Sequence, residues 1–259
     1  MTLRSLLWLS AIVLLVSACA PPPAARRAWD TNDGIASLWP LLEREWAALE
    51  NLTAEASVEF EQNGMRERAT ALIQVRGDDL FRMDVRGPFY SHVFTAVQRG
   101  DSLIVWGPAI GGAWKGAARG SLLLQLTGVD FGQYPLERAL LGWVKPVSRD
   151  HALQVDYERA DRAVGTVIEG PVRRRLWLDL HMGLFLREEV YDATDRPPVT
   201  RAMSNYVLVG PLFFPQRVEI AQGDVRIMLT YQSYDLKRVL NLVQFESGIP
   251  EEQLLRVDY

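Results

Sequence analysis

Two hydrophobic periodicities divide the chain beyond its first few dozen residues. Between residues 35 and 49 apolar side chains recur every three or four positions, which predicts one amphipathic helix. Asp33 or Ser37 could cap its start, and Pro40 fits only in its first turn. The polar face of this helix is acidic, so we expect the helix to pack on its own domain rather than on a membrane surface.

From residue 52 the period changes to two. Alternate residues of 52–61 are apolar, which predicts a half-buried strand, and Asn63-Gly64 is a hairpin turn signal. Similar short segments follow, separated by tight turns, and such a series predicts an antiparallel meander. The further expected strands are 69–75, 81–85, 91–98, 102–106, 153–159, 163–169, 172–180, 184–192, 199–208, 215–221 and 224–234.

The middle of the chain interrupts this pattern. A leucine-rich segment, 121–126, is closed by Gly128, and Tyr134-Pro135 opens a second short helix that Gly142 ends. We interpret the glycine-rich segment 111–116 as a loop, because a Walker motif needs Ser or Thr after its lysine. About twelve strands around a helical insertion predict one mainly β domain with a curved or barrel-like sheet, over residues 34–259.

The first residues have the features of an export signal. Arg4 is the only charge before residue 26, and the apolar run 6–16 is too short to span a membrane comfortably. The segment 16–19, Val-Ser-Ala-Cys, resembles a bacterial lipobox, which implies removal of residues 1–18 and lipid on the thiol of Cys19. Two or three acyl chains anchor a protein stably, since each buried methylene contributes ~0.8 kcal/mol. An uncleaved signal anchor is the alternative.

The residues after Cys19 favour the lipoprotein interpretation. Residues 19–33 form a linker that begins with a stiff Pro/Ala-rich spacer, of the kind that holds a domain off a surface. By resemblance to proteobacterial lipoproteins, Ala20 implies sorting to the outer membrane, with the domain facing the periplasm. That rule depends on the clade, so the inner membrane stays an alternative.

Composition and motifs argue against several classes of protein. The formal charge of −4 disfavours nucleic acid as a partner. A single cysteine allows neither an internal disulfide nor a cysteine-based metal site, and the three histidines are far apart. No HExxH or GxSxG motif occurs. We therefore expect no catalytic residues, no metal and no cofactor, and place an enzyme behind the other hypotheses.

Two kinds of charged run remain, and we expect both to be solvated. The adjacent acid pairs at 78–79, 188–189 and 251–252 are typical of turns or strand rims, because neighbouring strand residues point to opposite faces. The basic run 173–175 would divide between the two faces of its strand in the same way. It could meet lipid phosphates, but the favoured interpretation is a solvated edge strand.

Several segments together resemble the LolA/LolB superfamily of bacterial lipoprotein carriers and its lipoprotein relatives. The pattern Asp-x-Phe-Arg begins at Asp79, and Phe-Pro-x-Arg begins at Phe214. The other similar segments are 87–90, 126–128, 135–142 and 183–189. The resemblance implies a strongly curved antiparallel sheet forming an unclosed barrel, with an N-terminal helix and a helical insertion covering the concave face. It also implies that Phe89 and Tyr90 form a membrane-facing loop, although Tyr90 and His92 make this loop more polar than usual.

In carriers of this kind the concave face holds acyl chains, and such a cavity needs apolar side chains without charges to solvate. The alternating pattern places ten candidates on that face: Val58, Phe60, Phe81, Met83, Val85, Leu176, Leu178, Ile227, Leu229 and Tyr231. The alternative is that these residues form an ordinary core beneath the helices.

The first functional hypothesis is a membrane-anchored lipoprotein that binds acyl chains of a lipid or lipoprotein, for transfer to or insertion in the outer membrane. A periplasmic carrier protein is a possible partner. The second hypothesis is an envelope scaffold or assembly factor of the same fold, with a cavity filled by its own side chains, that binds a protein partner.

Overall fold

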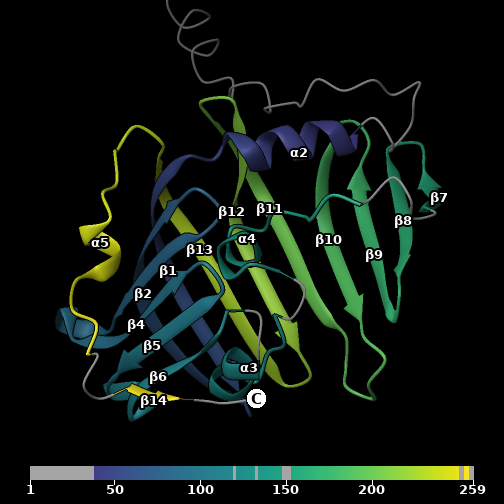
Figure 1. Ribbon diagram of the computed structural model, residues 1–259. Helices are drawn as coiled ribbons and strands as arrows, with labels where there is room; N and C mark the ends of the chain where they lie inside the picture. Colours follow the sequence, from purple (N-terminus) through teal and green to yellow (C-terminus); the bar gives the residue numbers. More distant parts are fainter. Residues whose placement is uncertain (1–37, 119–120, 132–133, 148–152, 251–253, 257–259) are drawn as a thin grey trace, which may run out of the picture.

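Fourteen strands pair into one continuous, strongly bent sheet in the computed structural model, which describes residues 38–118, 121–131, 134–147, 153–250 and 254–256 (Figure 1). The strands are β1 (Asn51–Gln62), β2 (Met65–Arg76), β3 (Leu80–Arg86), β4 (His92–Arg99), β5 (Ser102–Gly107), β6 (Gly112–Ala117), β7 (Leu153–Arg159), β8 (Arg162–Glu169), β9 (Val172–Asp179), β10 (Leu184–Tyr191), β11 (Val199–Val209), β12 (Leu212–Gln222), β13 (Val225–Asp235) and β14 (Leu254–Arg256). The predicted meander is confirmed, with more strands than expected.

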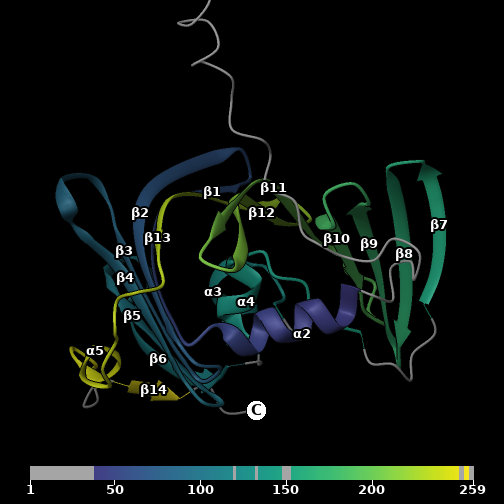
Figure 2. The same ribbon diagram turned by 90° about the horizontal axis from the view of Figure 1, so that it is seen from above.

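The sheet is an unclosed barrel, as predicted. Its order is β14-β6-β5-β4-β3-β2-β1-β13-β12-β11-β10-β9-β8-β7, so β14 and β7 are its two ends. Strands β1 to β13 pair antiparallel with their neighbours, whereas β14 runs parallel to β6. Pairing of β1 with β13 joins two meanders side by side at the centre of the sheet. Figure 2 shows the sheet curving around a concavity that stays open on one side.

The interpretation of 111–116 as a loop was wrong, since β6 occupies this region and pairs with β5 and β14. The absence of a side chain at Gly116 has a packing reason, because a Cβ there would lie 3.3 Å from the Cβ of Leu122 in the helical insertion. Glycine in a strand costs up to about 1 kcal/mol relative to alanine. Hydrogen bonds from β6 to the strands on both of its sides, β5 and β14, outweigh this cost. The short strand β14 was not predicted.

Within the described residues, most helices lie on the concave side of the sheet (Figure 2). Helix α2 (Trp39–Ala48) confirms the predicted N-terminal helix, with Pro40 in its first turn, whereas the proposed caps lie outside the described residues. Helices α3 (Ser121–Thr127) and α4 (Leu136–Leu140) form the predicted helical insertion. Helix α5 (Val243–Glu246) packs on the convex side, where Arg82 of β3 donates to its Gln244 carbonyl. Two single turns, η2 (Pro88–Tyr90) and η3 (Pro108–Ile110), complete the structure.

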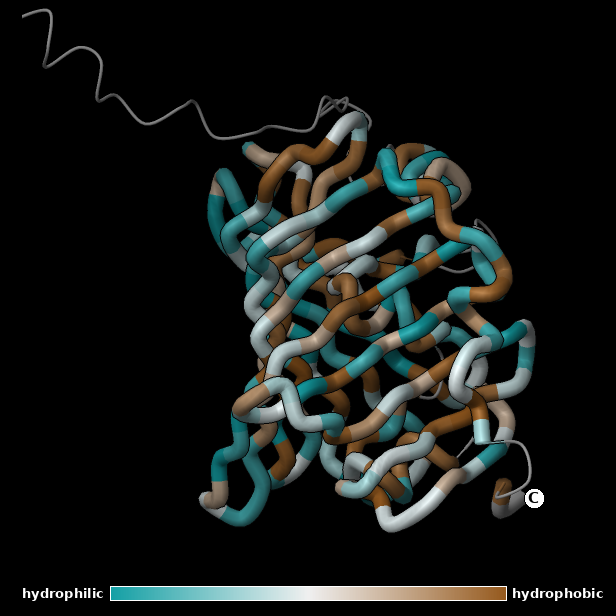
Figure 3. Tube along the Cα trace, turned by 90° about the vertical axis from the view of Figure 1, so that its left-hand side faces the viewer, coloured by the Kyte–Doolittle hydropathy of each residue, from teal (hydrophilic) through white to brown (hydrophobic). Residues whose placement is uncertain are grey.

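Alternating residues direct the strands' apolar side chains toward the concavity, and Figure 3 shows this alternation along the strands. The buried side chains form two clusters. The larger joins strands β1–β5, β12 and β13 to the helical insertion, and the smaller joins strands β8–β11 to α2. Burial of one side chain of valine size or larger contributes about 1.5–3 kcal/mol. Packing of the helical insertion and of α2 against the concave face therefore stabilises the fold substantially.

Gly142 ends α4 in a left-handed conformation, with φ +68°, against the sheet. A Cβ at this position would lie 2.8 Å from Met203 and 2.9 Å from both Pro215 and Val218. We expect Gly142→Ala to lower the free energy of unfolding by about 3 kcal/mol, because backbone strain adds to overpacking. Gly64→Ala is the matched control, because Gly64 has φ +77° but a Cβ there would meet no atom within 4 Å, and strain alone costs about 1–2 kcal/mol. Equal losses in urea unfolding would contradict the packing argument.

Candidate functional site

The concave face is the candidate site, and the structure places all ten predicted cavity residues on four strands that contribute to it. Eight of the ten are buried, and Val58 and Phe60 on β1 are half-buried. Six of the buried ones, on β3 and β13, belong to the larger cluster; the other two, Leu176 and Leu178 on β9, belong to the smaller. The predicted face is therefore divided into two apolar areas, each with its own helical cover.

The helical insertion fills the larger area with apolar side chains, among them Leu122, Leu136 and Leu140. Its position is held by a hydrogen bond of 2.9 Å from the Tyr231 hydroxyl to the Leu140 carbonyl oxygen. An aromatic series continues from Tyr231 through Tyr234 and Phe214 to Trp143, with ring centroids 4.6–5.1 Å apart. Because these contacts come from both sheet and insertion, they dock one against the other.

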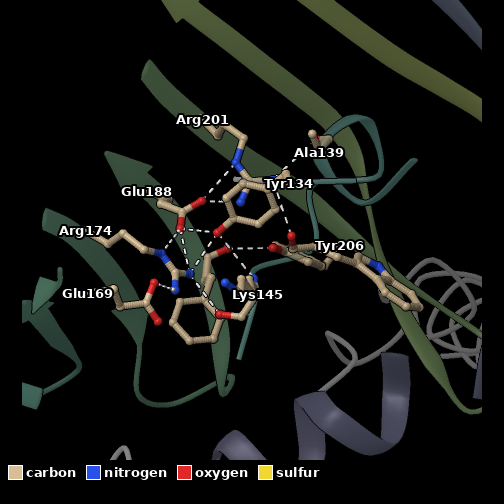
Figure 4. Close-up of polar contacts among 10 residues, drawn as sticks. Tyr134, Ala139, Lys145, Glu169, Arg174, Glu188, Arg201 and Tyr206 are labelled. Carbon is tan, nitrogen blue, oxygen red and sulfur yellow. Dashed lines mark hydrogen bonds and ion pairs between the residues drawn. The ribbon is translucent and has the colours of Figure 1, made fainter. Parts of the chain in front are cut away.

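A buried polar network ties the same insertion to strands β9, β10 and β11 (Figure 4). At its centre the Glu188 carboxylate is fully buried. One of its oxygens accepts from the Tyr134 hydroxyl and, at 2.9 Å, from Nε of Arg174; the other accepts from Nε of Arg201, also at 2.9 Å. Tyr134 lies just before α4, so this carboxylate joins three strands to the insertion.

The two arginines extend the network to the insertion's backbone. Nη2 of Arg174 donates to the Lys145 carbonyl oxygen at 2.8 Å. Nη1 of Arg201 donates to the Trp143 carbonyl oxygen at 3.3 Å, and its guanidinium carbon lies 3.9 Å from the centroid of the Tyr134 ring. Arg174 also forms an ion pair with Glu169, at 3.5 Å. Two buried positive charges are thus balanced by two carboxylates.

The charge states follow from these contacts. Burial alone would raise the pKa of the Glu188 carboxyl, but Arg201 and Arg174 outweigh burial and lower this pKa from 4.5 to about 2. Burial raises the pKa of the Tyr134 hydroxyl far above its usual range, so the phenol stays protonated and donates its hydrogen bond. The network is therefore a fixed ion cluster near neutral pH, without a group poised for proton transfer.

Two expectations about charged residues were wrong. Glu188 was expected at a solvated rim but is buried, and its neighbour Glu189 is only 8% exposed. The run 173–175 does divide between two faces, but its strand β9 lies between β8 and β10 rather than at an edge, and Arg174 is buried. The acid pair at 78–79 is exposed in a turn, as expected, and the pair at 251–252 lies outside the described residues.

Two hollows flank the insertion on the concave side. The larger, about 80 Å³ and partly open to solvent, reaches Tyr134 and Arg201 of the network and is otherwise lined mainly by apolar residues of β9–β11 and the insertion. At its exposed side, Arg196 forms ion pairs of 2.8 Å with Asp130 and Asp192. The smaller hollow, about 20 Å³, lies between α2, the end of the insertion and strands β10–β12. The insertion thus has free space on two sides.

The predicted membrane-facing loop is η2. Its two aromatic side chains are fully exposed or nearly so, at 101% for Phe89 and 82% for Tyr90. Both residues have positive φ, 56° and 58°, which is uncommon for aromatic residues and costs of order 1–3 kcal/mol each. A hydrogen bond of 2.8 Å from the Gly87 amide to the Ser91 carbonyl oxygen closes the turn. The turn therefore holds the two rings away from the core.

The described residues contain no group of three His, Cys, Asp or Glu side chains that could hold a metal ion. Within the same ranges, no helix is long and apolar enough to cross a membrane. Residues 1–18, the lipidation candidate Cys19 and the linker all lie outside the described ranges, and so does His151.

Solved structures with this architecture come from several bacteria. A LolA superfamily protein from Nitrosomonas europaea aligns over 81% of this chain and 96% of its own, with a TM-score of 0.56 and 12% identity. A domain named for outer membrane lipoprotein sorting, from Vibrio parahaemolyticus, aligns over 85% of this chain and 99% of its own, with a TM-score of 0.60 and 11% identity. This chain has a LolA-like fold. The resemblance found in the sequence is thereby confirmed for the architecture.

A DUF1329 family protein from Desulfovibrio piger shares the LolA-like fold over 85% of this chain and 99% of its own, with a TM-score of 0.59 and 12% identity. No protein-family model matches the sequence, and no curated protein matches it. At identities this low, the shared feature is the bent sheet with its covered concave face, and function has to be argued from that face.

Proposed function

We propose that this chain is a membrane-anchored lipoprotein whose concave face binds acyl chains of a lipid or of another lipoprotein, for transfer to or insertion in the outer membrane. The observation that carries the proposal is the extended apolar area that strands β1–β5, β12 and β13 present on the concave face of a sheet that stays open on one side. One of the similar structures is named for lipoprotein sorting, which supports the same class of cargo. The protein acts by binding and release, without catalysis.

Acyl chains would enter where the helical insertion now lies. The insertion is docked by a few polar contacts, including Tyr231 with Leu140 and Arg201 with Trp143, and it has hollows on both sides. Moving it outward would expose apolar strand residues without exposing a charge in the larger cluster. The Glu188 network would then serve as the fixed attachment about which the insertion moves, because its strand members belong to the adjoining half of the sheet.

The anchor and the partner belong to the same proposal. Lipid on Cys19 would tether the domain through the linker 19–33, facing the periplasm from the outer membrane, and a periplasmic carrier protein would supply the cargo. The anchor rests on the sequence pattern at residues 1–33, and the partner on the resemblance to lipoprotein carriers.

The second candidate function is a scaffold or assembly factor that binds an envelope protein. It is favoured by one observation: side chains of α2 and of the helical insertion already pack against the concave face. In that case the insertion stays in place and lipid has no room to enter.

The test uses residues 20–259, which contain every described strand and helix. The protein is purified from bacterial periplasm and analysed for bound lipid by native mass spectrometry, then titrated with a fluorescent fatty acid. We expect one lipid or lipid-like molecule per chain and saturable uptake of the probe. Protein that is empty and shows no saturable uptake would reject the carrier and leave the scaffold.

We also propose that the η2 loop meets the membrane during transfer. Replacing both aromatics, as Phe89→Ser with Tyr90→Ser, should slow transfer of a fluorescent fatty acid to phosphatidylcholine vesicles about tenfold, because shallow burial of two rings contributes about 1.4 kcal/mol to the contact. Met65→Ser is the matched control, since Met65 is a 71% exposed apolar residue at another turn. Equal transfer rates for the loop variant and the control would contradict this role.

A further inference from the structure

The convex side of strands β8, β9 and β10 carries arginines and aromatic residues in register. Arg173 pairs across the sheet with Ile168 and Tyr191, and Arg175 pairs with Thr166 and Glu189. Trp177 pairs with Val164 and Arg187 in the next row. Because alternate residues of a strand share a face, all these side chains lie on the side opposite Leu176 and Leu178. The arginine–aromatic patch is defined by Arg173, Arg175, Trp177, Arg187 and Tyr191.

Stacking orders the patch. The guanidinium carbons of Arg175 and Arg187 lie 4.8 Å and 5.2 Å from the Trp177 ring centroid, and that of Arg173 lies 4.2 Å from the Tyr191 centroid. Each arginine is therefore held over an aromatic face while part of its side chain stays in solvent, at 41% exposure for Arg175 and 48% for Arg187. A stacked guanidinium keeps its outward N–H groups available for a ligand.

The patch has an excess of positive charge in a chain whose formal charge is −4. The carboxylate within the patch is that of Glu189, whose oxygens lie 2.5 Å from Nη2 of Arg187 and 4.0 Å from Nη1 of Arg175. Arg173 forms no ion pair with a described residue. Several other exposed arginines of the convex side pair with carboxylates: Arg66 and Arg68 with Glu59, and Arg226 with Glu219. Three arginines against one carboxylate thus distinguish this patch from those paired arginines.

We propose that the arginine–aromatic patch is a docking surface for the phosphate headgroups of anionic phospholipids at a membrane surface. Guanidinium groups bind phosphate oxygens bidentately, and Trp and Tyr are the aromatic residues favoured at the membrane–water interface. Ile168 pairs with Arg173 across the sheet and is 62% exposed. Its aliphatic side chain favours a membrane surface as the ligand, because an acidic protein surface or a free anion would not require it. A tether at the N-terminus would keep such a surface within reach of the patch.

This surface is separate from the concave face and from the η2 loop. The patch belongs to strands β9 and β10 and the loop joins β3 to β4, which lie on opposite halves of the sheet in Figures 1 and 2. Contact through the patch is electrostatic and weakens as salt rises, whereas contact through two aromatic rings does not depend on salt. The two contacts can therefore be measured independently.

The experiment is co-sedimentation of residues 20–259 with vesicles of equal parts phosphatidylglycerol and phosphatidylcholine, compared with phosphatidylcholine alone. We expect salt-sensitive binding to the anionic vesicles. The triple variant Arg173→Gln, Arg175→Gln, Arg187→Gln should weaken it on the order of a hundredfold, because each basic residue near an anionic surface strengthens binding about fivefold. The control Arg66→Gln, Arg68→Gln, Arg226→Gln removes the same charge from the convex side of β2 and β13 and should leave binding unchanged.

Circular dichroism establishes that each variant is folded. If the triple variant is not, Arg173→Gln alone carries the test, with about a fivefold loss expected. Equal weakening by the patch and control triples would show a net-charge effect and overturn the proposal. So would undiminished binding by the patch variant, or binding of inorganic phosphate without binding of anionic vesicles. Uptake of a fluorescent fatty acid should be the same in the patch variant and the unmodified chain, so failure of this proposal is distinguishable from failure of the carrier function.

Discussion

Glu188→Gln should lower the free energy of unfolding by about 3–5 kcal/mol, because it leaves the buried guanidinium groups of Arg174 and Arg201 without their shared carboxylate. Such a loss is large against the roughly 5–15 kcal/mol that stabilises a typical domain. Because Tyr134 donates to the same carboxylate, the variant should also loosen the insertion from strands β9–β11. The arginine charges persist at any pH at which the protein folds, so they cannot relieve the imbalance by losing a proton.

Urea unfolding followed by tryptophan fluorescence measures this effect. The matched control is Glu59→Gln, which removes a carboxylate from a more exposed ion pair with Arg66 and Arg68 on the convex side. Surface pairs of that kind contribute about 0–1 kcal/mol. A loss below about 1 kcal/mol for Glu188→Gln would show that solvent reaches the network, contrary to the burial of its members.

The same carboxylate predicts a pH dependence of stability. The pKa of Glu188 is lower in the folded protein, at about 2, than its ordinary value of 4.5, so the folded state favours the ionised form. Its contribution is complete above pH 4.5 and is lost as the pH falls toward about 2. Thermal unfolding between these limits should show a steeper acid loss for the unmodified chain than for Glu188→Gln. Parallel curves would contradict the assignment.

Phe60→Glu should weaken uptake of a fluorescent fatty acid at least thirtyfold, if the carrier function holds. Phe60 is half-buried on the concave side of β1, so its replacement can stay solvated in the unliganded protein. An acyl chain on this face would have to desolvate the new carboxylate, and an uncompensated buried polar group costs about 2 kcal/mol or more. That amount corresponds to a factor of about thirty in affinity.

Thr230→Glu is the control for this variant, because it introduces the same charge on the convex side of the neighbouring strand β13. Thr230 is exposed and pairs with Ser57, three residues before Phe60. Its uptake of the probe should match that of the unmodified chain. Unchanged uptake by Phe60→Glu would exclude this end of the concave face from the binding site, and equal loss in both variants would indicate a general effect of charge.

The local sequence determined the elements that depend on short-range pattern. Helical spacing in 35–49 predicted α2, and alternation after residue 52 predicted the strands of both meanders other than β6, since burial on one face imposes a period of about 3.6 in a helix and of about 2 in a strand. Turn residues such as Asn63-Gly64 marked the hairpins, because positive φ is a local property. The helical insertion was also predicted from local signals, namely a leucine-rich segment closed by Gly128 and a short helix ended by Gly142. Alternation also placed Arg174 on the same face as Leu176 and Leu178.

The tertiary structure alone decided how charges and edges are arranged. An irregularity in the pairing of β9 with β10, between Phe185 and Arg187, shifts the alternation so that both Phe185 and Glu188 face inward. Plain alternation would have placed these two residues on opposite faces, so the local pattern could not reveal that Glu188 meets Arg174 and Arg201. The glycine-rich strand β6 likewise forms because β5 and β14 supply its hydrogen bonds. Pairing partners distant in the chain set both features, and no local periodicity encodes which strands become neighbours.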